Sequence, residues 1–387
     1  RADRRGHDAH DFGSLPLSVA FAIIFAIAVP MALVLLGWAH HWFWRGYFAP
    51  RDFPDELHNV RTSDGWRLGV RRYLPKGAHR YREPVILCHG LGANHYNLDW
   101  DPPVGIAQYL AARGRDCWVI SLRGHEGSDR PSRRNGLRWD FSFDDFARFD
   151  VPAVIEHVLA RTGAPRAQWV GHSMGGILAY AQGGTRFEEM IAGGIVAVAS
   201  PSSYSNQPYL RRLTRLGKIV AGSSRIPQRW ITHMIAPFTG HFDPPFSELV
   251  ISPQSMDPRI VRRLQAWAFE DISAGVIDQF DDWVHNDAFR SRDRKTNYRD
   301  AMEACTTPIY LVGGSKDLMV PPACLEVALR RLGSEDKTLS IFGKDRGHSA
   351  DYGHGDLLMG RAAPAEIFPS IGAWLEARAT PADPGNP

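Results

Sequence analysis

The sequence contains few cysteines and no block of charge of one sign. Its four cysteines are Cys88, Cys117, Cys305 and Cys324. They are too few and too scattered for a disulfide framework, and none forms a CxxC pair that would indicate zinc or redox chemistry. A disulfide between Cys305 and Cys324 is the alternative that the sequence leaves open. With a formal net charge of +3 and no long charged run, the composition does not indicate nucleic acid as a partner.

The sequence also lacks ligand spacings for a metal or a phosphate. His89, His95, His125 and His172 have no matching ligand at helical spacing. No Walker-type Lys-Ser/Thr pair follows the glycine-rich segment at residues 171–175. We therefore expect no metal site and no Walker-type phosphate site.

Charged side chains are missing from one long stretch. No Asp, Glu, Lys or Arg occurs from Phe12 to Trp44, and Leu15–Gly37 is almost wholly apolar. As a helix with about 1.5 Å per residue, the apolar stretch would be roughly 35 Å long, enough to cross a hydrocarbon core of about 30 Å. Trp38, Trp42 and Trp44 stand where an interfacial aromatic belt is expected.

A cleaved signal peptide is the main alternative to a membrane span. The apolar run is longer than the about 7 to 15 residues usual in signal peptides, and Gly37-Trp38-Ala39 is a poor cleavage site. We therefore predict an uncleaved single-pass membrane anchor at residues 14–44, after an N-terminal flank at residues 1–13. Arginines on both sides of the anchor leave the side of the membrane unpredicted.

Beyond the anchor, short apolar runs alternate with helical segments. A hairpin is expected at Val60–Tyr73, with its turn at Asp64-Gly65. Further strands are expected at residues 84–88, 117–122, 167–170, 191–198, 308–312 and 338–342, with helices at 104–113, 146–162, 174–182, 322–332 and 365–377. Because the strands are almost continuously apolar, the pattern predicts the α/β class, with a mostly parallel sheet covered by helices on both faces.

The alternation stops in one long segment, which divides the core in two. Residues 201–298 are rich in Arg, Trp, Phe and Pro, and we interpret them as a mostly helical cap inserted between core residues 45–200 and 299–379. Within the cap, Tyr209–Val220 has apolar residues at helical spacing with basic residues between them. A solvated helix face is expected there, with contact to an anionic membrane as the alternative. Residues 380–387 are expected to form a disordered tail.

The motif Gly171-His172-Ser173-Met174-Gly175 lies between an expected strand and an expected helix. This is the context of a nucleophile elbow, in which a sharp turn projects the serine and small flanking residues relieve crowding. We therefore predict Ser173 as a nucleophile.

A serine nucleophile needs an acid, a base and oxyanion donors. Asp317, just beyond the strand at 308–312, is the expected acid, with a role as a helix cap or turn residue as its alternative. The oxyanion donors are expected to be the backbone N–H groups of Met174 and of Leu91, which follows His89-Gly90 after the strand at 84–88.

Two histidines compete for the role of base. His348 and His354 both lie in the loop after the strand at 338–342. The short distance from that strand favours His348, whereas the direct connection to the last helix favours His354. We choose His354 and keep His348 as the alternative.

These motifs resemble one known family, the acid lipase branch of the α/β-hydrolase superfamily. The similarity is carried by Phe141–Ile155, Thr162-Gly163 and Val170–Gly175, which resemble its helix and elbow. His89–Gly92 with Asn97–Trp100 is similar to its oxyanion region, and His354–Leu357 is similar to its His-x-Asp-Phe around the catalytic histidine. The resemblance covers roughly residues 59–200 and 307–375, and it supports His354 as the base.

The resemblance implies a serine ester hydrolase that uses a Ser-His-Asp triad and no cofactor. Its substrates would be lipid-like or small esters with apolar acyl groups, which enter beneath the cap. Met174 stands where lipases of this branch usually have Gln, and neither the cap nor the anchor matches theirs. Acyl transfer by the same triad, or a non-catalytic binding protein of this fold, are the alternative functions; the oligomeric state is not predicted.

Overall fold

The computed structural model describes residues 17–51, 54–78, 80–204, 207–222, 224–241 and 255–382. The chain divides into two units, residues 1–47 and 48–387. The predicted flank at 1–13 lies outside the described residues.

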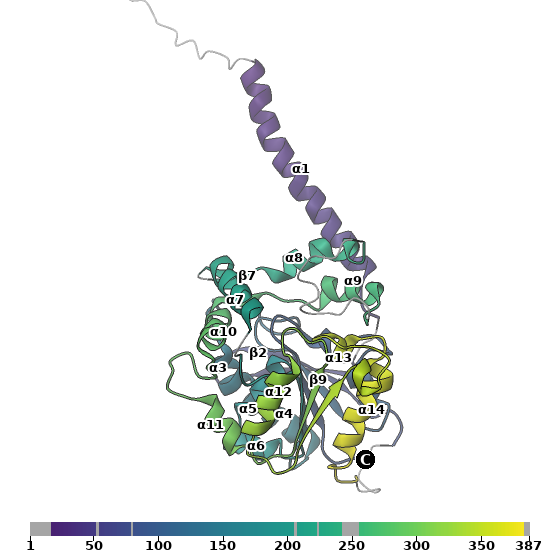
Figure 1. The fold of residues 1–387 in the computed structure, drawn as a ribbon. Helices are drawn as coiled ribbons and strands as arrows, with labels where there is room; N and C mark the ends of the chain where they lie inside the picture. The colour runs from purple at the N-terminus through teal and green to yellow at the C-terminus, as the bar shows by residue number, and fades with distance from the viewer. Residues whose placement is uncertain are drawn as a thin grey trace, which may run out of the picture. The chain divides into compact units, whose positions relative to one another are not determined.

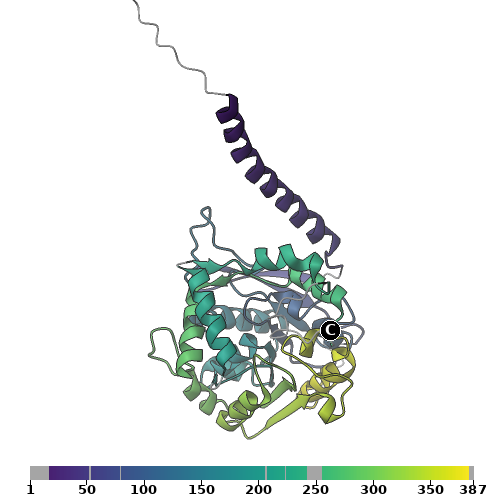
Figure 2. The same ribbon diagram turned by 45° about the horizontal axis from the view of Figure 1, so that its top comes forward.

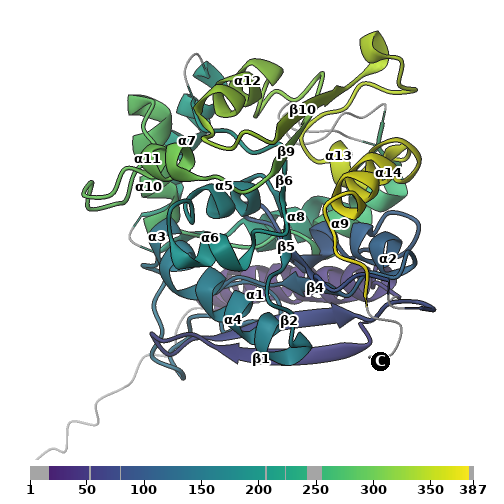
Figure 3. The same cartoon turned by 90° about the horizontal axis from the view of Figure 1, so that it is seen from below.

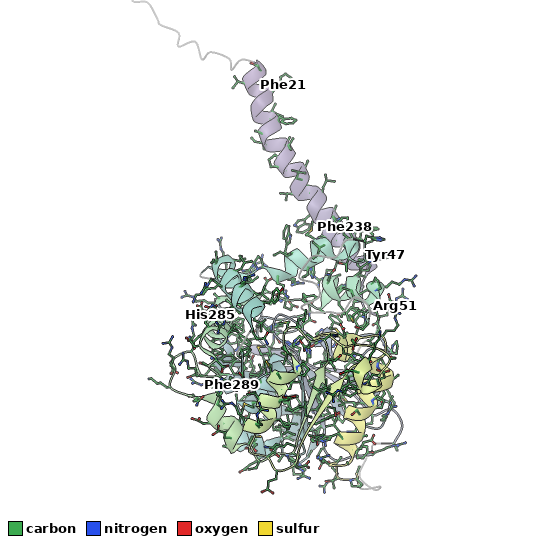
Figure 4. All side chains as sticks on the ribbon, in the orientation of Figure 1. Phe21, Tyr47, Arg51, Phe238, His285 and Phe289 are labelled. Atoms are coloured by element: carbon green, nitrogen blue, oxygen red, sulfur yellow. The ribbon has the colours of Figure 1, made fainter. Side chains whose placement is uncertain are left out.

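The first unit contains one long helix, α1 (Leu17–Tyr47), of 31 residues. At about 1.5 Å per residue it is about 46 Å long. It contains Pro30, and its apolar side chains are exposed, among them Phe25 and Phe21, which Figure 4 labels. Within α1, Ile24–Tyr47 contains an 18-residue window with a mean hydropathy of 1.7. By length and composition this stretch could span a membrane, a property that a signal sequence shares.

The second unit is built on an eight-stranded sheet of order β1-β2-β4-β3-β5-β6-β9-β10. β1 pairs antiparallel with β2, and β2 antiparallel with β4, whereas the six strands from β4 to β10 are mutually parallel. The strands are β1 (Glu56–Arg61), β2 (Arg67–Tyr73), β3 (Val85–Cys88), β4 (Cys117–Ile120), β5 (Gln168–His172), β6 (Ile195–Val198), β9 (Ile309–Gly314) and β10 (Lys337–Phe342). The predicted hairpin and the mostly parallel sheet are confirmed.

Helices cover both faces of this sheet, as Figure 3 shows with α4 and α6 on one side and α2 and α14 on the other. Because side chains alternate along a strand, Ile86 and Cys88 of β3 join one core cluster and Val85 and Leu87 join the other. The core helices are α2 (Ile106–Ala111), α3 (Phe143–Asp145), a π-helical turn (Phe146–Asp150), α4 (Val151–Thr162), α5 (Met174–Tyr180), α6 (Arg186–Met190), α11 (Tyr298–Ala304), α12 (Pro322–Arg331), α13 (Asp356–Met359) and α14 (Ala363–Glu376).

The inserted segment contains mainly helices, which lie together over one end of the sheet (Figure 1, Figure 2). They are α7 (Pro208–Ala221), α8 (Gln228–Ile235), a 3-10 turn (Ala236–Phe238), α9 (Pro258–Trp267) and α10 (Ala274–Asn286). Two short strands, β7 (Arg225–Ile226) and β8 (Ile272–Ser273), pair within it and were not expected from the sequence. We call the described residues of this range, 208–222, 224–241 and 255–286, the cap.

The described residues correct the predicted disordered tail and decide whether Cys305 and Cys324 form a disulfide. The predicted disordered tail is wrong for residues 380–382, because Arg82 N donates to Thr380 O, Ala382 N donates to Arg80 O and Tyr81 pairs with Pro381. Residues 383–387 lie outside the described residues. All four cysteines are free and buried, so the Cys305–Cys324 bridge is absent.

Candidate active site

Ser173 stands at the sharp turn between β5 and α5. Its backbone has φ 52° and ψ −115°, a left-handed conformation that costs a residue with a Cβ about 1–3 kcal/mol. The turn is held because Ser173 N donates to Val198 O at 2.7 Å and Ser173 O accepts from Gly176 N at 3.0 Å. The strained backbone is therefore locked by β6 on one side and by the first turn of α5 on the other.

The glycines around Ser173 are required by close packing. A Cβ on Gly171 would lie 2.3 Å from the carbonyl carbon of Gly175, and a Cβ on Gly175 would lie 2.2 Å from the carbonyl oxygen of Cys88. A Cβ on Gly90 would lie 3.1 Å from the Cβ of Ser173. These contacts bring the turn after β3 directly against the serine, as the predicted oxyanion arrangement requires.

Asp317 and His354 meet beside this turn. Asp317 follows β9, is 2% exposed, and its Oδ2 lies 2.9 Å from Nδ1 of His354. Its other oxygen, Oδ1, accepts hydrogen bonds from the backbone N–H groups of Met319 at 2.9 Å and Val320 at 2.7 Å. The carboxylate thus accepts two hydrogen bonds within its turn with one oxygen and contacts the imidazole of His354 with the other.

His348 lies apart from this pair in its contacts. Its Nδ1 is 3.1 Å from the carbonyl oxygen of Gly343, and its ring lies 4.6 Å from the ring of Phe342. Among the described residues, His354 is the one histidine whose ring contacts the Asp317 carboxylate. The structure therefore brings His354, and not His348, to the carboxylate.

His172, the residue before the serine, supports the loop of His354. Its Nε2 lies 3.1 Å from the backbone oxygen of His354, and the two rings are 4.9 Å apart. Burial, followed by the charge of His354, lowers the pKa of His172 to about 3. His172 is therefore neutral near neutral pH, donates its Nε2–H to that oxygen, and adds no positive charge beside the imidazole of His354.

The oxyanion loop, which we define as His89–Asn94, is ordered by a buried histidine. Nε2 of His89 accepts from the backbone N–H of Leu122 at 3.2 Å, so its Nδ1 carries the proton and donates to Gly90 O at 2.9 Å. In the described part of the chain, neither Leu91 N nor Met174 N donates a hydrogen bond to another backbone group.

The described residues contain no group of three or more His, Cys, Asp or Glu side chains that could hold a metal ion. Sequence reasoning missed two features of this site. One is the contact of His172 with the His354 loop, and the other is the attachment of the oxyanion loop to the cap, where Asn94 N donates to Ala268 O at 3.0 Å. Both join residues far apart in the chain, and no local pattern marks them.

The profile of the family described as alpha/beta hydrolase fold matches residues 83–205. The chain is 26% identical to lipase member K of Mus musculus over 363 residues, which cover 84% of this chain and 88% of that protein. It is 36% identical to a probable lipase of Schizosaccharomyces pombe over 138 residues, which span 33% of this chain and only 30% of that protein's length.

A solved structure of a soluble variant of monoglyceride lipase from Saccharomyces cerevisiae superposes with a TM-score of 0.57 at 17% identity, covering 85% of this chain and 96% of that chain. The chain therefore has the α/β-hydrolase fold. Within this fold it resembles lipases, which confirms the resemblance seen in the sequence, and the comparisons support a serine ester hydrolase.

Proposed function

We propose that the chain is a membrane-anchored serine hydrolase that cleaves carboxylic esters with apolar acyl groups through Ser173, His354 and Asp317. The observation that carries this proposal is the 2.9 Å contact of Asp317 with His354, in a loop that His172 ties to the strained turn of Ser173. A serine, a buried carboxylate and a histidine in this order along the chain are the parts of an α/β-hydrolase triad.

In the proposed reaction, Ser173 Oγ attacks the ester carbonyl carbon while His354 Nε2 accepts the hydroxyl proton. Asp317 keeps the proton of His354 on Nδ1 and stabilises the imidazolium that forms. Leu91 N–H and Met174 N–H donate to the oxyanion of the tetrahedral intermediate. The imidazolium then protonates the leaving alkoxide, and the acyl group stays on Ser173 until water, activated by the same histidine, releases the acid.

An exposed apolar stripe on the cap supports a lipid-like substrate. Tyr209, Leu213, Leu216 and Val220 repeat at i, i+4, i+7 and i+11 of α7 and are all exposed, and Trp230 of α8 is exposed too. A contiguous row of large exposed apolar side chains marks an interaction site.

We expect kcat/KM to rise with acyl length in a series of p-nitrophenyl esters from acetate to palmitate. The kcat/KM for long-chain esters should rise further when they are presented in phosphatidylcholine vesicles, because the apolar stripe would bring the cap to the lipid. Initial rates with and without vesicles measure this. A maximum at acetate that vesicles leave unchanged would contradict the lipid-like substrate while leaving the triad untouched.

We expect α1 to hold the full chain in the membrane during alkaline carbonate extraction. Its described stretch has no acidic residue, and each charged side chain at a helix centre costs about 2.5–3.5 kcal/mol on insertion. A variant with Ile27→Asp and Leu33→Asp should therefore move to the supernatant. Intact mass of the membrane fraction distinguishes an uncleaved anchor from a removed signal sequence, and release of the wild type by carbonate would contradict the anchor.

A further inference from the structure

A buried carboxylate of the cap lies against the oxyanion loop. Glu270, which follows α9, is 1% exposed. Its Oε1 accepts hydrogen bonds from Asn94 Nδ2 at 2.8 Å and from the backbone N–H of Glu126 at 3.0 Å. Its Oε2 forms an ion pair with Arg130. One side chain therefore joins the cap, the oxyanion loop and the loop after β4.

The backbone of the same cap segment pairs with the oxyanion loop. Glu270 N donates to Gly92 O at 2.8 Å, and Asn94 N donates to Ala268 O at 3.0 Å. Gly92 has φ +62°, and a Cβ there would lie 3.0 Å from the side chain of Ile272. The loop therefore has little freedom to move away from the cap segment without breaking these bonds.

Asn94 links this segment to the rest of the loop. It is fully buried, its Nδ2 also donates to Trp267 O at 2.8 Å, and its Oδ1 accepts from Tyr96 N at 3.1 Å. A buried amide that loses a partner costs about 1–3 kcal/mol, so the position of Asn94 depends on the acceptors that the cap supplies.

We propose that Glu270 is a positioning residue, whose carboxylate holds the oxyanion loop in place through Asn94 so that the N–H of Leu91 faces the reacting carbonyl. The proposal rests on the function proposed for Ser173. Glu270 does not touch the substrate in this mechanism. Its effect falls on an interaction made chiefly in the transition state, so its loss should lower kcat and leave KM nearly unchanged.

The charge of Glu270 matters because Arg130 and the two N–H donors converge on it. Burial raises the pKa of Glu270 to about 7, against the opposing effects of Arg130 and of the Asn94 hydrogen bond. Glu270 is charged above this pKa and neutral below it. The ion pair with Arg130 is therefore lost as the pH falls through about 7.

Other charged groups around Glu270 are few in the described structure. Glu126 pairs with Arg130 at 3.7 Å and with Arg229 of α8 at 3.4 Å. On its own segment the next residue is Asp271, which pairs with Arg225 of β7 at 2.7 Å. Burial raises the pKa of Asp271 as well, so it is a matched comparison that contacts the cap and not the oxyanion loop.

The decisive measurement is the ratio of kcat of the wild type to kcat of Glu270→Gln, across pH 5 to 9 on a soluble p-nitrophenyl ester. The full chain is used in detergent. We expect a kcat ratio of about 10 at pH 9, where Glu270 is charged. At pH 5 the ratio should be near one, because protonated Glu270 resembles Gln. Asp271→Asn should give a ratio near one at every pH.

A ratio for Glu270→Gln that is flat with pH, or a change in KM alone, would overturn the proposal. If Glu270→Gln does not fold, Arg130→Gln provides a second test, since the Arg130 side chain is 27% exposed. Loss of Arg130 should raise the pKa of Glu270 and move the acid limb of kcat to higher pH; an unmoved limb would contradict the role. Absence of wild-type turnover would instead contradict the proposed function itself.

Discussion

Ser173→Ala is expected to lower kcat/KM for p-nitrophenyl esters by about 10⁴- to 10⁶-fold, the range found when a triad nucleophile is removed. The alanine has no oxygen to attack the carbonyl, so no acyl-enzyme forms. Stability should be nearly unchanged, because alanine keeps the Cβ and meets the same φ of 52° as the serine. Rates with purified protein, together with thermal melting, measure both effects.

Labelling by a fluorophosphonate probe gives an independent readout of the same residue. The wild type should be labelled on Ser173, and Ser173→Ala should not be labelled. Ser349→Ala, a serine on the exposed loop between β10 and α13, is the control and should keep both labelling and turnover. Turnover that persists in Ser173→Ala would contradict the mechanism, and an unlabelled wild type would favour the non-catalytic binding protein.

The elbow was predictable from the sequence because its constraints are local. Gly171 and Gly175 are dictated by contacts at 2.3 and 2.2 Å within the turn or with the neighbouring strand β3, and the apolar run of β5 precedes them directly. The parallel sheet was predictable for the same reason, since each central strand is buried on both faces and reads as a continuous apolar run.

Other features depend on packing between distant segments, and no local pattern carries them. Thr380 reads as part of a polar tail, yet its N–H donates to Glu83, a residue 297 positions earlier, at 2.8 Å. No sequence pattern marked Glu270 as buried, because the cap has no regular alternation of apolar and polar residues. A single Glu in such a segment is indistinguishable from a solvated side chain. The contact of Glu270 with Asn94 across 176 residues appears only in the folded chain.

The choice between His348 and His354 also depends on packing between distant segments. Both histidines follow β10 within one loop, so spacing alone left them open. The structure separates them by their partners: Asp317 lies 2.9 Å from His354, whereas His348 contacts the backbone of Gly343. The loop passes over the end of β9, where Lys316 N donates to Tyr352 O at 2.9 Å, and this places the second histidine at the carboxylate.

His354→Ala is therefore expected to lower kcat about 10⁴- to 10⁶-fold, and His348→Ala only a few-fold. Without His354 no group accepts the proton of Ser173, and the imidazolium that Asp317 stabilises cannot form. His348→Ala loses a ring contact with Phe342 and a backbone contact, so its effect should fall on the melting temperature instead.

The two variants control for each other, because each removes one imidazole from the same loop. Turnover of a soluble ester and thermal melting should be measured for both. A large loss of kcat in His348→Ala, with near-normal turnover in His354→Ala, would reverse the assignment. Equal losses in both would mean that the loop as a whole had moved, and a melting temperature lowered in both proteins would identify that case. Selective loss in His354→Ala, with its melting temperature kept, is the result that the Asp317 contact predicts.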